Sequence, residues 1–111
     1  MADIISFHDV EKLDIRIGTI LRAERVPDAD RLLHLVVDAG EGAPRDIVSG
    51  IAQHYPDPEV LKGRQVPVVV NLRPRTIRGV KSEGMILYVV GGDVLATLEP
   101  SERVPSGTPV R

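Results

Sequence analysis

The sequence predicts an all-β fold, a small five-stranded barrel with a short helical turn between its third and fourth strands and extended terminal segments. Short apolar segments follow one another at close spacing, separated by turns rich in Gly, Pro and Asp. The first segment is long and contains Gly18, where a strand can bend around a barrel. A β-sandwich remains the alternative, and the helical turn favours the barrel. The 111 residues suffice for one core, so we expect a single domain over residues 1–111.

The chain begins with a short helical pattern over residues 6–12. Ser6 is a suitable N-cap, and Asp9 in the first turn would interact favourably with the helix dipole. Phe7 and Val10 are expected to face inward. The sequence therefore predicts one short helix before the strands begin.

Alternating apolar and polar residues in 13–26 predict a half-buried first strand. The alternation slips over residues 18–21, and because a glycine inside a strand often marks a bulge or bend, we expect one there. Further strands are expected at residues 31–40, 45–51, 66–72, 84–90 and 94–98. Pro58 suits the first position of the helical turn, which would end at Gly63, and a hairpin turn is expected at 91–93. This order of elements is typical of the OB-type barrel.

Composition and motif spacing argue against an enzyme, a metal site or a membrane span. The chain has no Cys, and His8, His34 and His54 share no metal-ligand spacing. Ser49 is not part of a nucleophile elbow, and no glycine-rich phosphate loop is present. No apolar run approaches 18 residues, and the N-terminus lacks the basic and apolar regions of a signal peptide. We therefore expect a non-catalytic cytoplasmic protein without cofactor or metal.

Positive charge is concentrated in one segment of an otherwise acidic chain. Residues 71–81 contain Arg73, Arg75, Arg78 and Lys81 and no carboxylate, although the whole chain has a formal net charge of -2. The segment lies between the fourth and fifth predicted strands, where about nine residues exceed the usual length of a hairpin loop. Arginine forks suit phosphate, so the segment predicts an anion-binding loop. A solvated loop that pairs with nearby carboxylates is the alternative.

Few aromatic side chains are available to stack on nucleic-acid bases. The chain contains only Phe7, Tyr55 and Tyr88. Barrels of this type that bind single strands stack bases on aromatic rings. If this protein binds nucleic acid, we therefore expect contacts to phosphate and to overall shape to dominate over base reading.

Three stretches resemble the tRNA-binding domain family when taken together and in order. They are LDIRIGTILRAERVPDADRLLHLVVDAG, then IVSGIAQHY, then VVVNLRPRTIRGVKSEGMIL, within a resemblance that covers residues 5–111. Domains of this family follow the catalytic parts of many methionyl-tRNA synthetases and also occur as separate chains, including synthetase β-subunits. The resemblance implies an OB barrel, a homodimer when free-standing, association with an aminoacyl-tRNA synthetase, and recognition of tRNA by shape.

The resemblance also assigns candidate tRNA-binding residues by position. The family's binding surface matches Asn71, Arg73, Arg75, Arg78, Ser82 and Met85, and Lys81 adds a fourth cation to the same segment. Arg31 and His34 fall where relatives often carry lysines. Two purely structural alternatives stay open. Met85 could be a core residue, and Ser82 could cap the loop by bonding to the backbone.

A sister family, the CsaA-type export chaperones, supplies the alternative function. It shares the barrel and the dimer, and it would bind unfolded polypeptides in an apolar groove. Its members tend to carry an NFPPR-like motif where this sequence reads NLRPR, followed by SEGMIL. The resemblance therefore favours the tRNA-binding branch.

Overall fold

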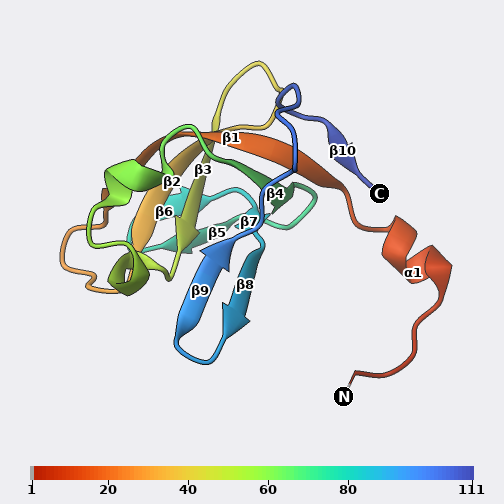
Figure 1. The fold of residues 1–111 in the computed structure, drawn as a ribbon, viewed down its shortest axis with the longest axis horizontal. Coiled ribbons are helices and arrows are strands. Elements are labelled where there is room, and N and C mark those ends of the chain that lie inside the picture. Colours follow the sequence, from red (N-terminus) through yellow and green to blue (C-terminus); the bar gives the residue numbers. More distant parts are fainter. Residues whose placement is uncertain (1) are drawn as a thin grey trace.

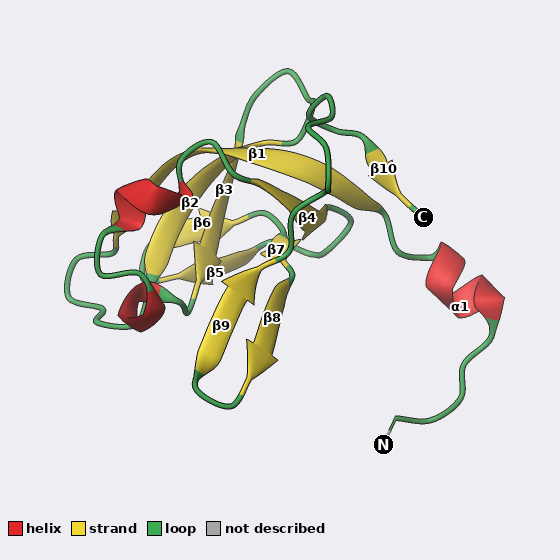
Figure 2. Cartoon of the chain, viewed as in Figure 1, coloured by secondary structure: helices red, strands yellow, loops and turns green. Residues whose placement is uncertain are grey.

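A computed structural model describes residues 2–111, which form a curled, mostly antiparallel β structure (Figures 1 and 2). The elements of these residues are α1 (Phe7–Glu11), β1 (Ile15–Arg25), β2 (Leu33–Asp38), β3 (Arg45–Ser49), the 3₁₀ turns η1 (Ala52–His54) and η2 (Pro58–Leu61), β4 (Gln65–Val69), β5 (Arg75–Ile77), β6 (Val80–Ser82), β7 (Met85–Ile86), β8 (Tyr88–Gly91), β9 (Val94–Thr97) and β10 (Pro109–Val110).

The main sheet confirms the five-stranded, all-β barrel. Its strands lie in the order β3-β2-β1-β4-β7, and β10 pairs with the start of β1. The long strand β1 pairs with a different strand along each half of its length. Residues 15–19 pair with β4, and residues 19–25 pair with β2. One strand that pairs on both sides in this staggered way curls the sheet, whereas a sandwich would stack two separate sheets.

Backbone and side-chain bonds from the outer strand β3 to the end of β6 and the residue after it nearly close the barrel. The Glu83 amide donates to the Asp46 carbonyl at 2.7 Å, and the Val48 amide donates to Ser82 Oγ at 3.0 Å. The enclosed core is aliphatic, as the sequence predicts. Its buried members are Ile20, Ala23, Leu33, Leu35, Val37, Ile47, Ile51, Ala52, Leu61, Val66, Val68 and Ile86.

The bend in β1 lies beyond the glycine that the sequence singles out. Pairing with β2 shifts register between Ile20 and Arg22, so the expected irregularity is present where the alternation slips, although it is centred a few residues past Gly18. Gly18 itself is needed for close packing. A Cβ atom there would lie 2.4 Å from Cγ1 of Val37, inside van der Waals contact.

The predicted strand 84–90 is two strands. β7 pairs with β4, whereas β8 leaves that sheet and pairs with β9 in a separate hairpin. The expected turn at 91–93 connects β8 to β9 and contains Gly92 at a φ of 58°. The strand prediction failed here because a continuous apolar run does not reveal that its pairing partner changes.

The terminal segments confirm the predicted cap and correct the predicted packing. The Asp9 amide donates to Ser6 Oγ at 3.3 Å, which completes an N-cap. Phe7 and Val10 do not face inward, since they are 76% and 48% exposed. Helix α1 stands away from the barrel (Figure 1), so the rest of residues 2–111 leaves much of these two side chains uncovered. With five residues, α1 is far too short to cross a bilayer.

The connection between β3 and β4 contains the predicted helical turn. η2 begins at Pro58 and is capped by Asp57, whose carboxylate accepts from the Glu59 amide at 3.2 Å. A second 3₁₀ turn, η1, precedes it and was not predicted.

Candidate nucleic-acid interface

The basic segment is a β-hairpin rather than an open loop. β5 and β6 pair in register, with Arg75 opposite Ser82 and Ile77 opposite Val80. A two-residue turn joins them, and Arg78 and Gly79 in it have φ values of 50° and 80°. Two left-handed residues match the twist of paired strands, which is why the chain folds back here. The expectation of a nine-residue loop was therefore wrong, and the backbone that carries the cations is ordered by its own ladder.

Ser82 fixes this hairpin to the barrel. Its side chain is buried, and its hydroxyl accepts the hydrogen bond from Val48 of β3. The bond to the backbone that the sequence analysis held open as an alternative is present, although it goes to a distant strand and not to the loop itself. Buried in this way, Ser82 positions the hairpin.

Asn71 also has a positioning role in the structure. Its side-chain oxygen accepts from the Asp14 amide at 2.9 Å, and its side-chain nitrogen donates to the Lys12 carbonyl at 2.7 Å. These two bonds join the residue just past β4 to the segment just before β1. Asn71 thereby fixes the start of the basic segment.

The four cations of the segment are exposed and carry no internal counter-charge. Within residues 2–111, no carboxylate forms an ion pair with Arg73, Arg75, Arg78 or Lys81. Elsewhere in the chain, Arg45 is held by Glu41 at 2.6 Å. The alternative of a basic loop neutralised by neighbouring carboxylates is therefore wrong.

The hairpin distributes its cations over two faces. Side chains alternate along a strand, so Arg75 and Ile77 share one face while Lys81 lies on the other. Arg73 and Arg75 line a cavity of about 380 Å³ beneath the hairpin, and Lys81 does not. The sequence placed all four on one surface, and the structure brings only two of them to this cavity.

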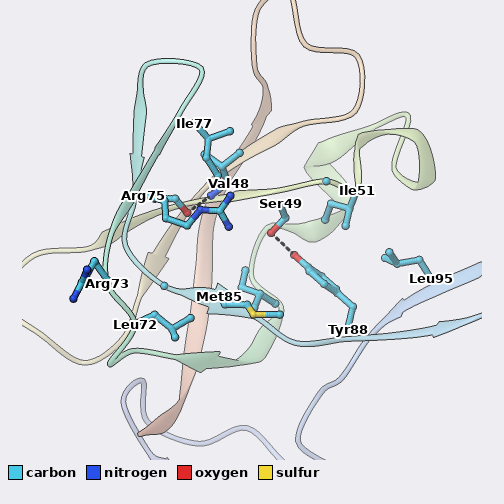
Figure 3. A pocket seen from close by; sticks show the side chains of 14 residues that line it. Val48, Ser49, Ile51, Leu72, Arg73, Arg75, Ile77, Met85, Tyr88 and Leu95 are labelled. Carbon is cyan, nitrogen blue, oxygen red and sulfur yellow. Dashed lines mark hydrogen bonds between the residues drawn. The ribbon is translucent and has the colours of Figure 1, made fainter. Parts of the chain in front are cut away.

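The cavity is mostly apolar, with one polar pair inside (Figure 3). Its lining residues are Val48, Ser49, Gly50, Ile51, Leu72, Arg73, Arg75, Ile77, Ser82, Gly84, Met85, Ile86, Tyr88 and Leu95. The Tyr88 hydroxyl donates to Ser49 Oγ at 3.0 Å, and burial raises the pKa of Tyr88 to about 12. The phenol is therefore neutral at physiological pH. Met85 is 52% exposed at the rim, so it is not a core residue.

A second hollow, of about 350 Å³, brings together His34 and Arg78. His34 Nε2 lies 2.8 Å from Asp46 Oδ1, and its Nδ1 lies 3.9 Å from Glu24 Oε1. Two carboxylates thus surround His34, which reduces its value as a phosphate contact. Arg25 lines the same hollow and was missed by the sequence analysis.

Arg31 is exposed just before β2, outside the sets of residues that line these two hollows. Its carbonyl accepts from the Ala52 amide at 3.1 Å, so its backbone is fixed while its side chain points to solvent. Of the predicted site residues, Arg31 is the one that lies neither in the basic segment 71–82 nor in the lining of these two hollows.

Comparison with known families assigns the part of the chain that forms the barrel and the hairpin to one family. The sequence model of a family described as "Putative tRNA binding domain" matches residues 15–109. The chain belongs to this tRNA-binding domain family. The match includes the whole basic hairpin and both hollows.

Relatives and solved structures agree with this assignment. Methionine–tRNA ligase of Porphyromonas gingivalis is 48% identical over 112 residues, an alignment that covers 100% of this chain and 16% of the ligase. A MetRS-related protein of Pyrococcus horikoshii is 32% identical with a TM-score of 0.90, covering 99% of this chain and 100% of that one. The chaperone CsaA of Bacillus anthracis is 34% identical with a TM-score of 0.87, covering 98% of this chain and 100% of that one.

These comparisons show two kinds of relative with one barrel. This tRNA-binding-family chain spans about a sixth of the length of the ligases that it matches. Because a chaperone and a synthetase-related protein share its fold, the fold alone does not choose between RNA and polypeptide as the ligand. The choice depends on the chemistry of the hairpin and its cavity.

Tyr88 and Ser49 are the polar cavity residues that sequence reasoning missed as site residues. The sequence analysis counted Tyr88 only among scarce aromatics and examined Ser49 only as a nucleophile. The two lie 39 positions apart and meet because β3 and β8 approach each other at one end of the barrel. No local motif could have indicated that meeting.

Proposed function

We propose that this chain is a non-catalytic module that binds tRNA through the basic hairpin, residues 71–82, and the cavity beneath it. The observation that carries the proposal is the set of four exposed cations, none of which forms an ion pair within residues 2–111. A guanidinium that is not already bonded to a carboxylate is free to bind phosphate, and its planar fork suits bidentate contact. Residues 1–111 would act as one binding unit.

The hydrogen bonds that fix the hairpin to the rest of the protein support this proposal. Asn71 fixes its start and Ser82 fixes its end, so the cations are held on an ordered strand pair. Ordering in advance lowers the entropy lost on binding. With four cations in the hairpin and a total charge of -2, the remainder of the chain has a net charge of about -6 and repels a polyanion elsewhere. Arg31 and His34 would be peripheral contacts.

The terminal segments support a homodimer as the working form. Exposed apolar side chains from both ends of the chain, among them Phe7, Val10, Leu13 and Val110, line a hollow of about 460 Å³. We propose that a second copy covers this surface. Two hairpins at a fixed spacing would then bind one folded tRNA, and their joint binding would select its shape and add avidity.

We further propose that the natural partner of the module is methionyl-tRNA synthetase. Its matched relatives are methionine–tRNA ligases, in which the corresponding segment is 16% of the chain. As part of such an enzyme or as a separate helper, the module would raise the affinity for tRNA in the cytoplasm. No step of the ligase reaction is assigned to its residues.

Polypeptide binding is the second candidate function. The CsaA chaperone of Bacillus anthracis supports it, together with the apolar lining of the cavity. Two guanidiniums at the same cavity favour RNA, because an apolar segment would leave them without an anionic partner. Suppression of client aggregation that persists in excess tRNA would favour the chaperone.

The direct test is the double variant Arg73→Ala/Arg75→Ala, assayed for tRNA binding at about 100 mM salt. We expect affinity to fall about tenfold or more, because two charge-assisted contacts to phosphate are lost. A matched double variant, Lys62→Ala/Arg103→Ala, removes the same charge outside the hairpin and should bind nearly as well as the unaltered chain. Equal affinities for the two double variants would refute the proposed site.

A further inference from the structure

We propose that the cavity beneath the hairpin receives one unstacked nucleotide of the bound RNA, with its base against Tyr88 and Met85 and its phosphate at Arg75. This inference rests on the proposed function and deepens it. It replaces the expectation that bases play little part with one specific base contact for each barrel.

The size of the cavity limits the ligand to a single nucleotide unit. Its volume of about 380 Å³ lies at the lower end of small-molecule sites, which span about 300–1,000 Å³. A paired helix cannot enter such a hollow. A nucleotide turned out of a tRNA loop can, and unpaired loop nucleotides are what proteins read most often in RNA.

The walls offer the chemistry that a base requires. Tyr88 supplies an aromatic ring, and Met85 supplies a polarisable side chain at the rim (Figure 3). Bases stack on aromatic rings whatever their identity, and thioethers pack well against aromatic edges. Leu95 and Ile77 complete an apolar surround on the flanks. Only one of the three aromatics is used, which agrees with one base per barrel.

A polar group inside the cavity is available to the edge of the base. Ser49 Oγ accepts the hydrogen bond from Tyr88, which leaves the proton of the Ser49 hydroxyl to be donated. Ser49 is buried, and within residues 2–111 no acceptor is bonded to that proton. A carbonyl oxygen or ring nitrogen of a base would satisfy it. Each of the four bases has a ring nitrogen or a carbonyl oxygen that can accept a hydrogen bond, so modest base preference is expected.

The charge at the cavity selects a phosphorylated ligand. Arg75 extends toward Ser49 across the cavity, while Arg73 lies at its outer edge (Figure 3). The lining contains these two guanidiniums and no carboxylate. An apolar peptide side chain would fill the hollow and leave both cations unpaired. A nucleotide fills it and pairs with them, so a nucleotide fits the charge better than a peptide does.

The test separates base contact from phosphate contact by salt dependence. Met85→Ala and Tyr88→Leu should each weaken tRNA binding about tenfold, as loss of one stacked base does, with an unchanged slope of log K against log salt. Tyr88→Phe keeps the ring and should stay within about threefold of the unaltered chain. Val90→Ala, an exposed apolar change outside the cavity, is the matched control and should have no effect.

A titration of the unaltered, isotope-labelled chain provides the second measurement. Adenosine 5′-monophosphate should shift the NMR signals of Ser49, Tyr88 and Leu95, whereas ribose 5-phosphate should shift only those of Arg73 and Arg75. If Tyr88→Leu does not fold, as judged by circular dichroism, Met85→Ala and this titration decide.

Three outcomes would overturn the inference. Unchanged affinity in folded Tyr88→Leu and in Met85→Ala, with weak binding by Arg73→Ala/Arg75→Ala, would leave the proposed function standing without a base contact. Signals from the cavity that respond to an extended apolar peptide and not to the nucleotide would make it a peptide site. Absence of tRNA binding by the unaltered chain would overturn both proposals.

Discussion

Ser82 and Arg75 face each other across the basic hairpin and have different roles. Both residues line the cavity, but Ser82 is buried and bonded to β3, whereas Arg75 is exposed. Both were assigned to the same binding surface by their positions in the sequence. In the structure one side chain holds the hairpin in place, and the other is available to a ligand.

The variant Ser82→Ala tests this division of roles. It leaves the partly buried Val48 amide without its acceptor, which costs about 1–3 kcal/mol of stability. Urea unfolding should show this loss. The tRNA affinity of the folded variant, measured well below its unfolding midpoint, should stay within about threefold of the unaltered chain, since no charge is lost. A large loss of affinity at unchanged stability would instead make Ser82 a direct phosphate contact.

At the residue scale, the sequence identifies charge types but not partners. It was clear that Arg73, Arg75, Arg78 and Lys81 form a basic cluster. That they lack counter-ions within residues 2–111 is visible only in the fold. Ser82 bonds to a residue 34 positions away, and no periodic pattern encodes such a contact.

The turn of the hairpin places a positively charged side chain on a backbone position with a left-handed conformation. Arg78 has a φ of 50°, a region that most residues with a side chain avoid, and Gly79 follows at 80°. A two-residue turn of this kind prefers Asn-Gly. The turn therefore keeps an arginine where asparagine would fit the backbone better, as expected if the cation is used for binding.

The variant Arg78→Asn separates these two properties. Asn keeps the turn, so thermal unfolding should show stability unchanged or raised by a few tenths of a kcal/mol. The tRNA affinity should fall several-fold at low salt, and the magnitude of the salt slope should fall by about 0.7–0.9, because one phosphate contact is lost. Full affinity in this variant would show that the tip of the hairpin does not touch the RNA.

At the element scale, long periodic strands were predictable and short ones were not. Alternation and apolar runs locate β1 to β4 within a few residues. β5 and β6 have three residues each, too few for a period to be recognised, so the hairpin was taken for a loop. The division of 84–90 into β7 and β8 depends on which strands are adjacent, and that follows from closure of the barrel.

At the scale of the whole molecule, the basic hairpin and the apolar terminal surface lie apart. The basic hairpin and its cavity lie at one part of the barrel, and one group of exposed apolar side chains lies near the two chain ends. The helical segment that was expected to pack inward contributes Phe7 to this terminal surface. An exposed apolar surface of this kind is unfavourable in water, and a second copy that covered it would remove it from solvent.

The variant Phe7→Glu tests the role of the terminal surface. A buried charge at a dimer contact should convert a dimer to a monomer in analytical ultracentrifugation. Loss of two-site binding should then weaken tRNA binding by about 10² or more, with the hairpin intact. Val90→Glu is the matched control, because Val90 is apolar, is 73% exposed and lies outside this surface. It should change neither the oligomeric state nor the affinity for tRNA. A monomeric unaltered chain with full affinity for tRNA would contradict the dimer proposal.

The central claim, that the cations of the hairpin bind tRNA phosphate, is tested most directly by salt dependence. The measurement compares tRNA binding over about 50–200 mM salt for the unaltered chain and for Arg73→Ala/Arg75→Ala/Arg78→Asn/Lys81→Ala, which keeps the turn. Four contacts predict that the slope of log K against log salt is smaller in magnitude by about 3 per barrel in the variant. The same slope and affinity in both proteins would contradict the account.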